Sequence, residues 1–385
     1  MFLWSPKLQK VLTWRAMTTP LASIIGSGFL VLGPILNTAY GRFAPLVMAA
    51  LCLVAYLYGA AIRYNITAIE THGKGRGRLV NSFETVASWS LGFAYIVSVA
   101  YYLNLFGAFG VSLTAVNDPV HAKLLTSAVF GIILIVGWRR GFKALEGMEY
   151  VTVTLKLAII AGLLVGLLVY FYGKASGGHL VFIPAELTGW PAVTLAFGLI
   201  VTVQGFETSR YLAADYNSTV RIRSMRWAQW VSTAIYMIYI LLLAYVFERQ
   251  QVSLSETAII DLMSLVAPIL PVLLVAAALA AQFSAAVADT SGSGGLISEL
   301  THNRVSPRMA YALLTVIGLI LTWSANVFEI ISFASRAFAF YYALQAAIAA
   351  MTAWRQPDQK KKALFFASLA MLGILIVLFG KAIEA

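Results

Sequence analysis

The chain has 385 residues, of which 60% are hydrophobic and 11% are charged, and its mean hydropathy is +0.83. A soluble domain carries about 25% charged residues, so this composition excludes a soluble globular protein and indicates a membrane protein. The formal net charge of +11 would suit a nucleic-acid-binding protein. The basic residues are instead spread over short loops between apolar segments, which favours a role in membrane topology.

The N-terminal residues 1–14 lack a short apolar stretch that ends in a small-residue cleavage site, so we expect no cleavable signal peptide. Cys52 is the one cysteine of the sequence, which excludes an intrachain disulfide and a multi-cysteine metal site. No polar tract longer than about 20 residues separates the apolar segments. We therefore expect one transmembrane domain over residues 1–385, without cofactor or metal.

A membrane-spanning helix needs about 20 apolar residues. By this rule the sequence predicts an all-α protein with about eleven spans. When alternate loops are assigned to opposite sides, one side holds about eighteen Lys and Arg residues and the other about five. This bias predicts a cytoplasmic N-terminus and an external C-terminus, with the inner membrane of a bacterium as the expected location. The expected spans are residues 12–38, 43–66, 85–115, 122–138, 149–172, 191–215, 226–247, 266–298, 309–325, 328–353 and 364–382.

The first and sixth spans are each interrupted near the middle by glycine and polar residues. Residues 26–28 read Gly-Ser-Gly, and residues 204–208 read Gln-Gly-Phe-Glu-Thr. Because the two spans are an odd number apart, they cross the membrane in opposite directions. Interrupted helices at matching positions of two inverted halves indicate the binding site of a transporter. The alternative is that the glycines only allow neighbouring helices to pack closely.

A break in a membrane helix exposes N–H groups at the start of its outer half and C=O groups at the end of its inner half. These ends carry partial charges of about half an electron, and unwound backbone is tolerated at this depth only beside a cavity or inside protein. The N–H groups near residues 27 and 28 suit a carboxylate, and the C=O groups of residues 203–205 suit an ammonium. The predicted substrate contacts are Ile25, Gly26, Ser27, Gly28, Val203, Gln204, Gly205, Phe206 and Glu207.

Three segments resemble one family of transporters. They are SIIGSGFLVLGP at residues 23–34, GFETSRYLAADYNSTVRIR at 205–223 and SELTHNRVSPRMAY at 298–311. The first resembles the Gly-Ser-Gly signature of the amino acid–polyamine–organocation (APC) superfamily. The second resembles the sixth helix of that superfamily, and the third resembles the exit of its eighth helix.

This resemblance implies a leucine-transporter-type fold with a five-plus-five inverted repeat and broken helices 1 and 6. The first repeat would cover about 12–172, the second about 191–353, and an extra helix 364–382. It also implies alternating access and a small organic substrate, most often an amino acid or an amine. Residues 26–28 would then contact the carboxylate, Gly205 the amine, and Phe206 would cover the site as an aromatic gate.

Two ionisable residues inside the spans are candidates for ion coupling, since charges at this depth are costly. Lys156 and Asp289 lie roughly 10–14 Å from the cytoplasmic ends of their helices at 1.5 Å per residue. In the resembled fold, a lysine on the fifth helix is typical of sodium-independent, proton-coupled members, and a lysine removed from water releases its proton more readily. Thr290 and Ser293 accompany Asp289. The alternatives are a structural ion pair and a sodium ion held by Asp289.

Three further charged residues lie within the sixth and tenth spans. Glu207 falls in the proposed break, where it would receive an amine, pair with an arginine or take up a proton. Arg336 suits an outer gate, with helix pairing as the alternative. Arg210 follows Glu207 by three residues, so we expect the two to form a pair within the helix.

Other classes of protein fit the sequence less well. The run Ser-Gly-Ser-Gly at residues 291–294 could serve as a nucleophile loop, but the histidines fall in loops or at helix edges, where they cannot act as its base. The sequence also lacks the pore loop or ring-forming polar helix that a channel requires. We therefore predict a non-enzymatic secondary transporter for a small amino acid or related amine, coupled to protons. Sodium-coupled or exchange transport of another solute, or a channel or sensor, is the alternative.

Overall fold

The computed structural model describes residues 11–26, 28–72, 77–140, 142–212, 216–251 and 255–382. In these residues all regular structure is helical, without strands, as the all-α prediction requires. The helices are α2 (Leu12–Ile24), α3 (Gly28–Tyr40), α4 (Ala44–His72), α5 (Arg78–Val111), α6 (Pro119–Arg140), α7 (Phe142–Ser176), α8 (Gly189–Gly198), α9 (Ser218–Ala244), α10 (Ala258–Val266), α11 (Leu270–Leu300), α12 (Pro307–Ser324), α13 (Val327–Trp354) and α14 (Lys360–Phe379). Short 3₁₀ segments are η2 (Gly41–Phe43), η4 (Ile200–Val203), η5 (Phe206–Tyr211), η6 (Arg249–Gln251) and η7 (Pro357–Gln359).

Within the described residues, 9 stretches are long and apolar enough to cross a membrane. One of them, Gly28–Thr71, joins α3 to α4 through the short segment η2. The helices α2 and α8, with 13 and 10 residues, are too short to cross a membrane by themselves. The predicted first and sixth spans are therefore the ones that the structure divides. The total of about eleven spans and the inverted repeat stay predictions.

The outer surface of the helices is apolar. Large hydrophobic side chains are exposed on α4, α6, α7, α12 and α14, for example Leu46, Ile132, Val169, Val316 and Leu378. Lipid solvates such side chains without cost, and the helices satisfy their own backbone hydrogen bonds. The molecule is a multi-pass membrane protein.

Side-chain caps fix where several helices begin. Asn217 and Ser306 each accept a hydrogen bond from the backbone N–H three residues further on, at 3.0 and 3.4 Å. At the start of α13, Asn326 and Glu329 exchange such bonds in a capping box, both at 2.9 Å. These contacts satisfy N–H groups that have no partner within the helix.

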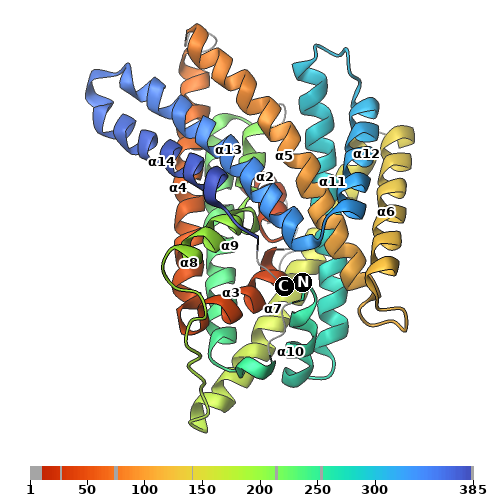
Figure 1. Cartoon of the computed structure of the whole chain (residues 1–385). Helices are drawn as coiled ribbons and strands as arrows, with labels where there is room; N and C mark the ends of the chain where they lie inside the picture. Colours follow the sequence, from red (N-terminus) through yellow and green to blue (C-terminus); the bar gives the residue numbers. More distant parts are fainter. Residues whose placement is uncertain are drawn as a thin grey trace.

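The helices pack as two groups. The first helix group consists of α2, α4, α9 and η5, and the second consists of α5, α6, α11 and α12. Figure 1 shows α4, α8 and α9 on the left, and α6, α11 and α12 on the right. The helix α13 touches both α4 and α5, so it lies between the two groups, and α14 packs on α13. The helix α2 also contacts α11, so one of the two broken segments touches the second helix group.

The predicted extra helix is present as α14, and its end lies against α8. The backbone N–H of Lys381 donates to the carbonyl of Thr194 at 2.9 Å. A Cβ on Gly198 would lie 1.8 Å from the carbonyl oxygen of Lys381, so only glycine fits there. The chain after α13 therefore packs against the first part of the predicted sixth span.

Candidate functional site

The helical structure is interrupted at both of the positions that glycine and polar residues indicated. The helix α2 ends at Ile24, and a new helix begins at Gly28. In the second segment, α8 ends at Gly198, η4 follows, and Gly205 adopts a left-handed φ of 114° before η5 begins. Because Gly205 has no side chain, it takes this conformation without the clash that other residues would suffer.

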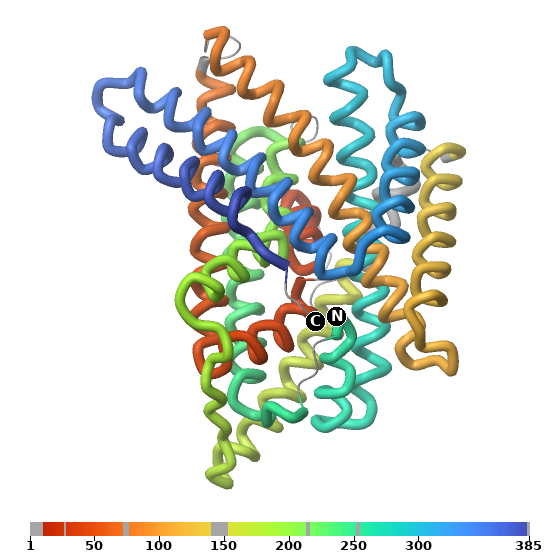
Figure 2. Tube along the Cα trace, in the orientation of Figure 1, coloured from red at the N-terminus to blue at the C-terminus, as the bar shows by residue number. Residues whose placement is uncertain are grey.

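The two broken segments cross in contact, backbone against backbone. A Cβ on Gly28 would lie 2.5 Å from the carbonyl oxygen of Thr202, and a Cβ on Gly205 would lie 2.5 Å from Oγ of Ser23 and 2.7 Å from N of Ile24. Figure 2 shows the red N-terminal trace and the green trace of this region side by side in the middle of the molecule. Each segment therefore contributes a glycine where the other segment passes.

Protein side chains hold the carbonyl groups at the end of α2. The hydroxyl of Tyr236, in α9, lies 2.8 Å from the carbonyl oxygen of Ile24 and 2.7 Å from that of Thr202, so it joins both broken segments. Nζ of Lys156, in α7, donates to the carbonyl of Ala22 at 2.6 Å. The positive ammonium suits the C-terminal end of a helix, where the carbonyl groups concentrate negative partial charge.

The carboxylate of Glu207 lies at the crossing and is fully buried. Its Oε2 accepts from the N–H of Gly205 and from the hydroxyl of Tyr342, both at 2.9 Å. Its Oε1 has no hydrogen-bond partner among the described residues. A buried carboxylate oxygen without a partner is costly, and it is therefore available to a ligand that brings an N–H or O–H donor.

Gln204 and Phe206 complete this arrangement. Nε2 of Gln204 donates to the hydroxyl of Tyr102 at 2.7 Å, and its Oε1 is buried without a partner in the described part of the chain. The ring of Phe206 stacks on Tyr342, with centroids 5.1 Å apart and planes 18° apart. The carbonyl of Gly205, one of those expected to hold an ammonium, instead accepts from the hydroxyl of Thr208 at 2.7 Å.

The structure brings together the predicted substrate contacts that it describes. All of them are buried: Ile25, Gly26, Gly28, Val203, Gln204, Gly205, Phe206 and Glu207. Ser27 lies outside the described residues. Tyr102, Tyr236 and Tyr342 are additional members that sequence reasoning did not select. They are three of 18 tyrosines, and nothing in their local sequence distinguishes them.

Comparisons with known proteins identify the family of the chain. Residues 6–380 match the model of a family described as APC superfamily transporter. The chain belongs to this family. It is also 43% identical over 390 residues to a protein of Aquifex aeolicus (strain VF5) described as uncharacterized, a match that covers 100% of this chain and 95% of the relative. The predicted resemblance to the superfamily is thus confirmed, and the chain is a transporter.

In this transporter, the residues predicted for ion coupling lie on α7 and α11. Asp289 accepts a hydrogen bond from the hydroxyl of Ser98, in α5. The hydroxyl of Thr290 donates to a carbonyl of its own helix at 2.7 Å, and that of Ser293 reaches the carbonyl of Gly92 at 3.4 Å. Lys156 is fully buried and holds the last turn of α2. A direct pair between the lysine and the aspartate stays a prediction.

Two arginines of the transporter have partners that sequence reasoning did not foresee. The expected pair between Arg210 and Glu207 is wrong, because Arg210 forms an ion pair with Glu84 of α5 instead. Arg336, expected at an outer gate, donates from Nε and Nη2 to the carbonyl of Gly380 at 3.0 and 2.5 Å. It also lines a groove of about 630 Å³ between α5, α13 and α14. A gating role for Arg336 stays a prediction.

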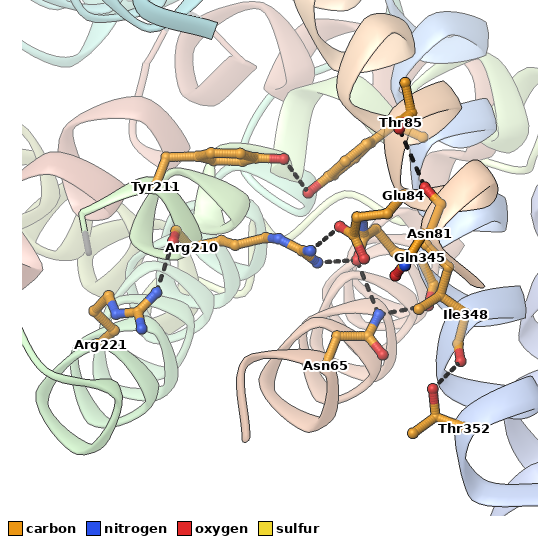
Figure 3. A network of polar contacts seen from close by, with 11 residues as sticks. Asn65, Asn81, Glu84, Thr85, Arg210, Tyr211, Arg221, Gln345, Ile348 and Thr352 are labelled. Atoms are coloured by element: carbon orange, nitrogen blue, oxygen red, sulfur yellow. Dashed lines mark hydrogen bonds and ion pairs between the residues drawn. The ribbon is translucent and has the colours of Figure 1, made fainter. Parts of the chain in front are cut away.

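Arg210 is the centre of a larger polar network, shown in Figure 3, which we call the Arg210 network. Besides Glu84, its guanidinium donates to Oε1 of Gln345, in α13. Nδ2 of Asn65, in α4, donates to the backbone carbonyl and to Oε1 of Gln345 at 2.8 and 2.9 Å. Nη1 of Arg221, in α9, donates to the carbonyl of Arg210 at 2.8 Å. The network consists of Asn65, Glu84, Arg210, Arg221 and Gln345.

Proposed function

We propose that this chain is a secondary transporter that carries a small amino acid or a related amine by alternating access. The observation that carries the proposal is the carboxylate of Glu207, which is buried at the crossing of two broken helical segments and has one oxygen without a partner among the residues that the structure describes. A buried anion is stable only with a compensating partner. A substrate ammonium supplies a positive charge and N–H donors together.

The other end of the substrate would bind at the start of α3. The first N–H groups of a helix have no partner within the helix, and they carry positive partial charge. A substrate carboxylate beside Gly28 would accept hydrogen bonds from them. The ammonium would then face Oε1 of Glu207 and Oε1 of Gln204. Both ends of a zwitterion are thus matched by groups from opposite broken segments.

Proton coupling would act through Lys156. As an ammonium, Lys156 holds the carbonyl of Ala22 in the last turn of α2. When the lysine loses its proton, the attraction between a positive charge and the helix end disappears. The end of α2 is then held less firmly, directly beside the residues that would contact the substrate. Protonation and substrate binding would therefore influence the same turn of the chain.

Alternating access would use the two helix groups. The members of the first helix group contact one another closely, as do those of the second. The described members of the candidate site are buried, and Gln204 contacts Tyr102 of α5 in the second helix group. A substrate would therefore enter when the groups separate on one side. We place the basic loops in the cytoplasm of a bacterium, in accordance with the excess of positive charge on that side.

Uptake into liposomes tests this proposal. We would reconstitute the purified protein and follow labelled amino acids and amines under an imposed proton gradient, and separately under a sodium gradient. We expect proton-driven uptake in the wild type. Lys156→Ala should abolish proton-driven accumulation but retain exchange of labelled for unlabelled substrate. The matched control is Lys174→Ala, since Lys174 lies at the far end of the same helix, with its ammonium 5.7 Å from the ring centre of Tyr170.

The outcomes separate the alternatives. Accumulation driven by sodium and unaffected in Lys156→Ala would contradict proton coupling and would move the ion site to Asp289. Uptake without exchange, growing linearly with the electrochemical gradient, would indicate a channel. If neither amino acids nor amines are taken up, the proposed substrate class is wrong.

A further inference from the structure

The ion pair between Arg210 and Glu84 connects the two helix groups. Arg210 belongs to η5, which packs against α2, α4 and α9. Glu84 belongs to α5, which packs against α6, α11 and α12. A relative movement of the two groups at this place must therefore separate the two charges.

Arg210 is buried, and Glu84 is partly buried. The side chain of Arg210 is 6% exposed and that of Glu84 is 21% exposed. Charges removed from water are stable mainly while they are paired, and removing one partner leaves the other uncompensated. Water that enters between the groups would solvate both charges. The pair consequently favours the closed arrangement and costs least to break when the opening is wide enough for water.

The pair also lies beside the candidate site, on the side of the basic loops. Arg210 follows Glu207 by three residues, roughly 6 Å along a 3₁₀ segment. The Arg210 network extends to the beginnings of α5 and α9 and the far ends of α4 and α13, which Figure 1 shows in the upper part of the molecule. These helix ends adjoin the loops that carry most of the positive charge.

We propose that the ion pair between Arg210 and Glu84 is a latch that closes the transport pathway on the side of the basic loops. The proposal adds a gate to the proposed function but does not depend on the substrate. Gln345 accepts a hydrogen bond from the guanidinium of Arg210. Asn65 donates to Gln345 and so connects α4 to the pair. Arg221 holds the carbonyl of Arg210, so η5 moves together with α9.

Accessibility of a cysteine next to the latch tests the proposal without any substrate. Ser209 directly precedes Arg210 in the sequence, and its side chain is buried. We would introduce Ser209→Cys in a Cys52→Ala background, and measure its reaction with a membrane-impermeant methanethiosulfonate applied from each side of oriented vesicles. Glu84→Gln removes the charge but keeps the shape of the side chain. We expect it to speed labelling from the basic-loop side on the order of tenfold, which corresponds to about 1.4 kcal/mol in the opening equilibrium.

A matched control uses a second ion pair of the same region, which is more exposed to solvent. Glu70 pairs with Arg221 at 3.2 Å, but its side chain is 47% exposed. Exposed pairs contribute little, so Glu70→Gln should change the labelling rate less than about twofold. The exchanged pair, Glu84→Arg with Arg210→Glu, should label more slowly than Glu84→Gln because it restores opposite charges.

Unchanged labelling in Glu84→Gln, or acceleration only from the opposite side, would overturn the proposal. If Glu84→Gln is not monodisperse on size exclusion, the labelling rate of the double variant with exchanged charges tests the proposal instead. Slow labelling at the wild-type rate then supports the latch, and fast labelling contradicts it. Because labelling requires no transport, a wrong substrate class in the uptake assay leaves this result intact.

Discussion

Replacing Gly205 by alanine should strongly destabilise the transporter. The new Cβ would lie 2.5 Å from Oγ and 2.6 Å from Cβ of Ser23, and 2.7 Å from the backbone N of Ile24. The φ of 114° is unfavourable for a residue with a side chain. The left-handed conformation costs about 1–2 kcal/mol, and overpacking a buried contact costs about 1–3 kcal/mol. Together we expect a loss of about 2–5 kcal/mol in the free energy of unfolding.

Thermal unfolding of the detergent-purified protein, followed by intrinsic fluorescence, measures this loss. We expect the Tm to fall by roughly 2–6 °C, because the shift is the lost free energy divided by an unfolding entropy of about 2.1 cal/mol/K per residue. Gly162→Ala is the matched control, because nothing lies within 4 Å of its would-be Cβ in α7. Alanine there should leave the Tm unchanged or raise it, since alanine is the better helix former by about 1 kcal/mol. Equal Tm values for the two variants would refute the close crossing of the broken segments.

Two conservative substitutions test the contacts around this crossing. Tyr236→Phe leaves two buried carbonyl groups without their shared donor and should cost about 1–3 kcal/mol, whereas Tyr239→Phe, whose hydroxyl lies 3.5 Å from its acceptor, should cost much less in the same unfolding assay. The reverse order would contradict the bridging role of Tyr236. Glu207→Gln preserves shape and an acceptor oxygen but removes the charge, so the Tm should change little, while uptake at low substrate concentration should fall on the order of tenfold, about 1.4 kcal/mol. Unimpaired uptake would exclude Glu207 as the partner of the ammonium.

The positions of the breaks could be predicted because their cause is local. Glycine and polar residues in the middle of an apolar segment weaken the helix at that place, whatever surrounds it. The end of α2 at Ile24 and the φ of Gly205 follow from such local preferences. The same reasoning placed Glu207 at the site, since it follows Gly205 by two residues in the sequence.

The partners of the charged residues could not be predicted in this way. The pair between Arg210 and Glu207 was expected from a spacing of three residues, but Glu84, more than a hundred residues away, lies closer in space. Likewise, Tyr342 contacts Glu207 through the packing of α13 against the crossing. A spacing rule describes neighbours on one helix. It carries no information on which side chain of another helix will face them.

The crossing of the two broken segments also has a consequence for the order of folding. Ser23 and Gly205 are about 180 residues apart in the sequence, and contacts between such distant residues form late because the intervening chain must first be ordered. During synthesis, the end of α2 enters the bilayer before η4 exists. The carbonyl of Ile24, at the end of α2, has no hydrogen bond from Tyr236 until α9 is also made. The N-terminal half made alone should therefore fail to reach its native structure, and a co-expressed C-terminal half should rescue it.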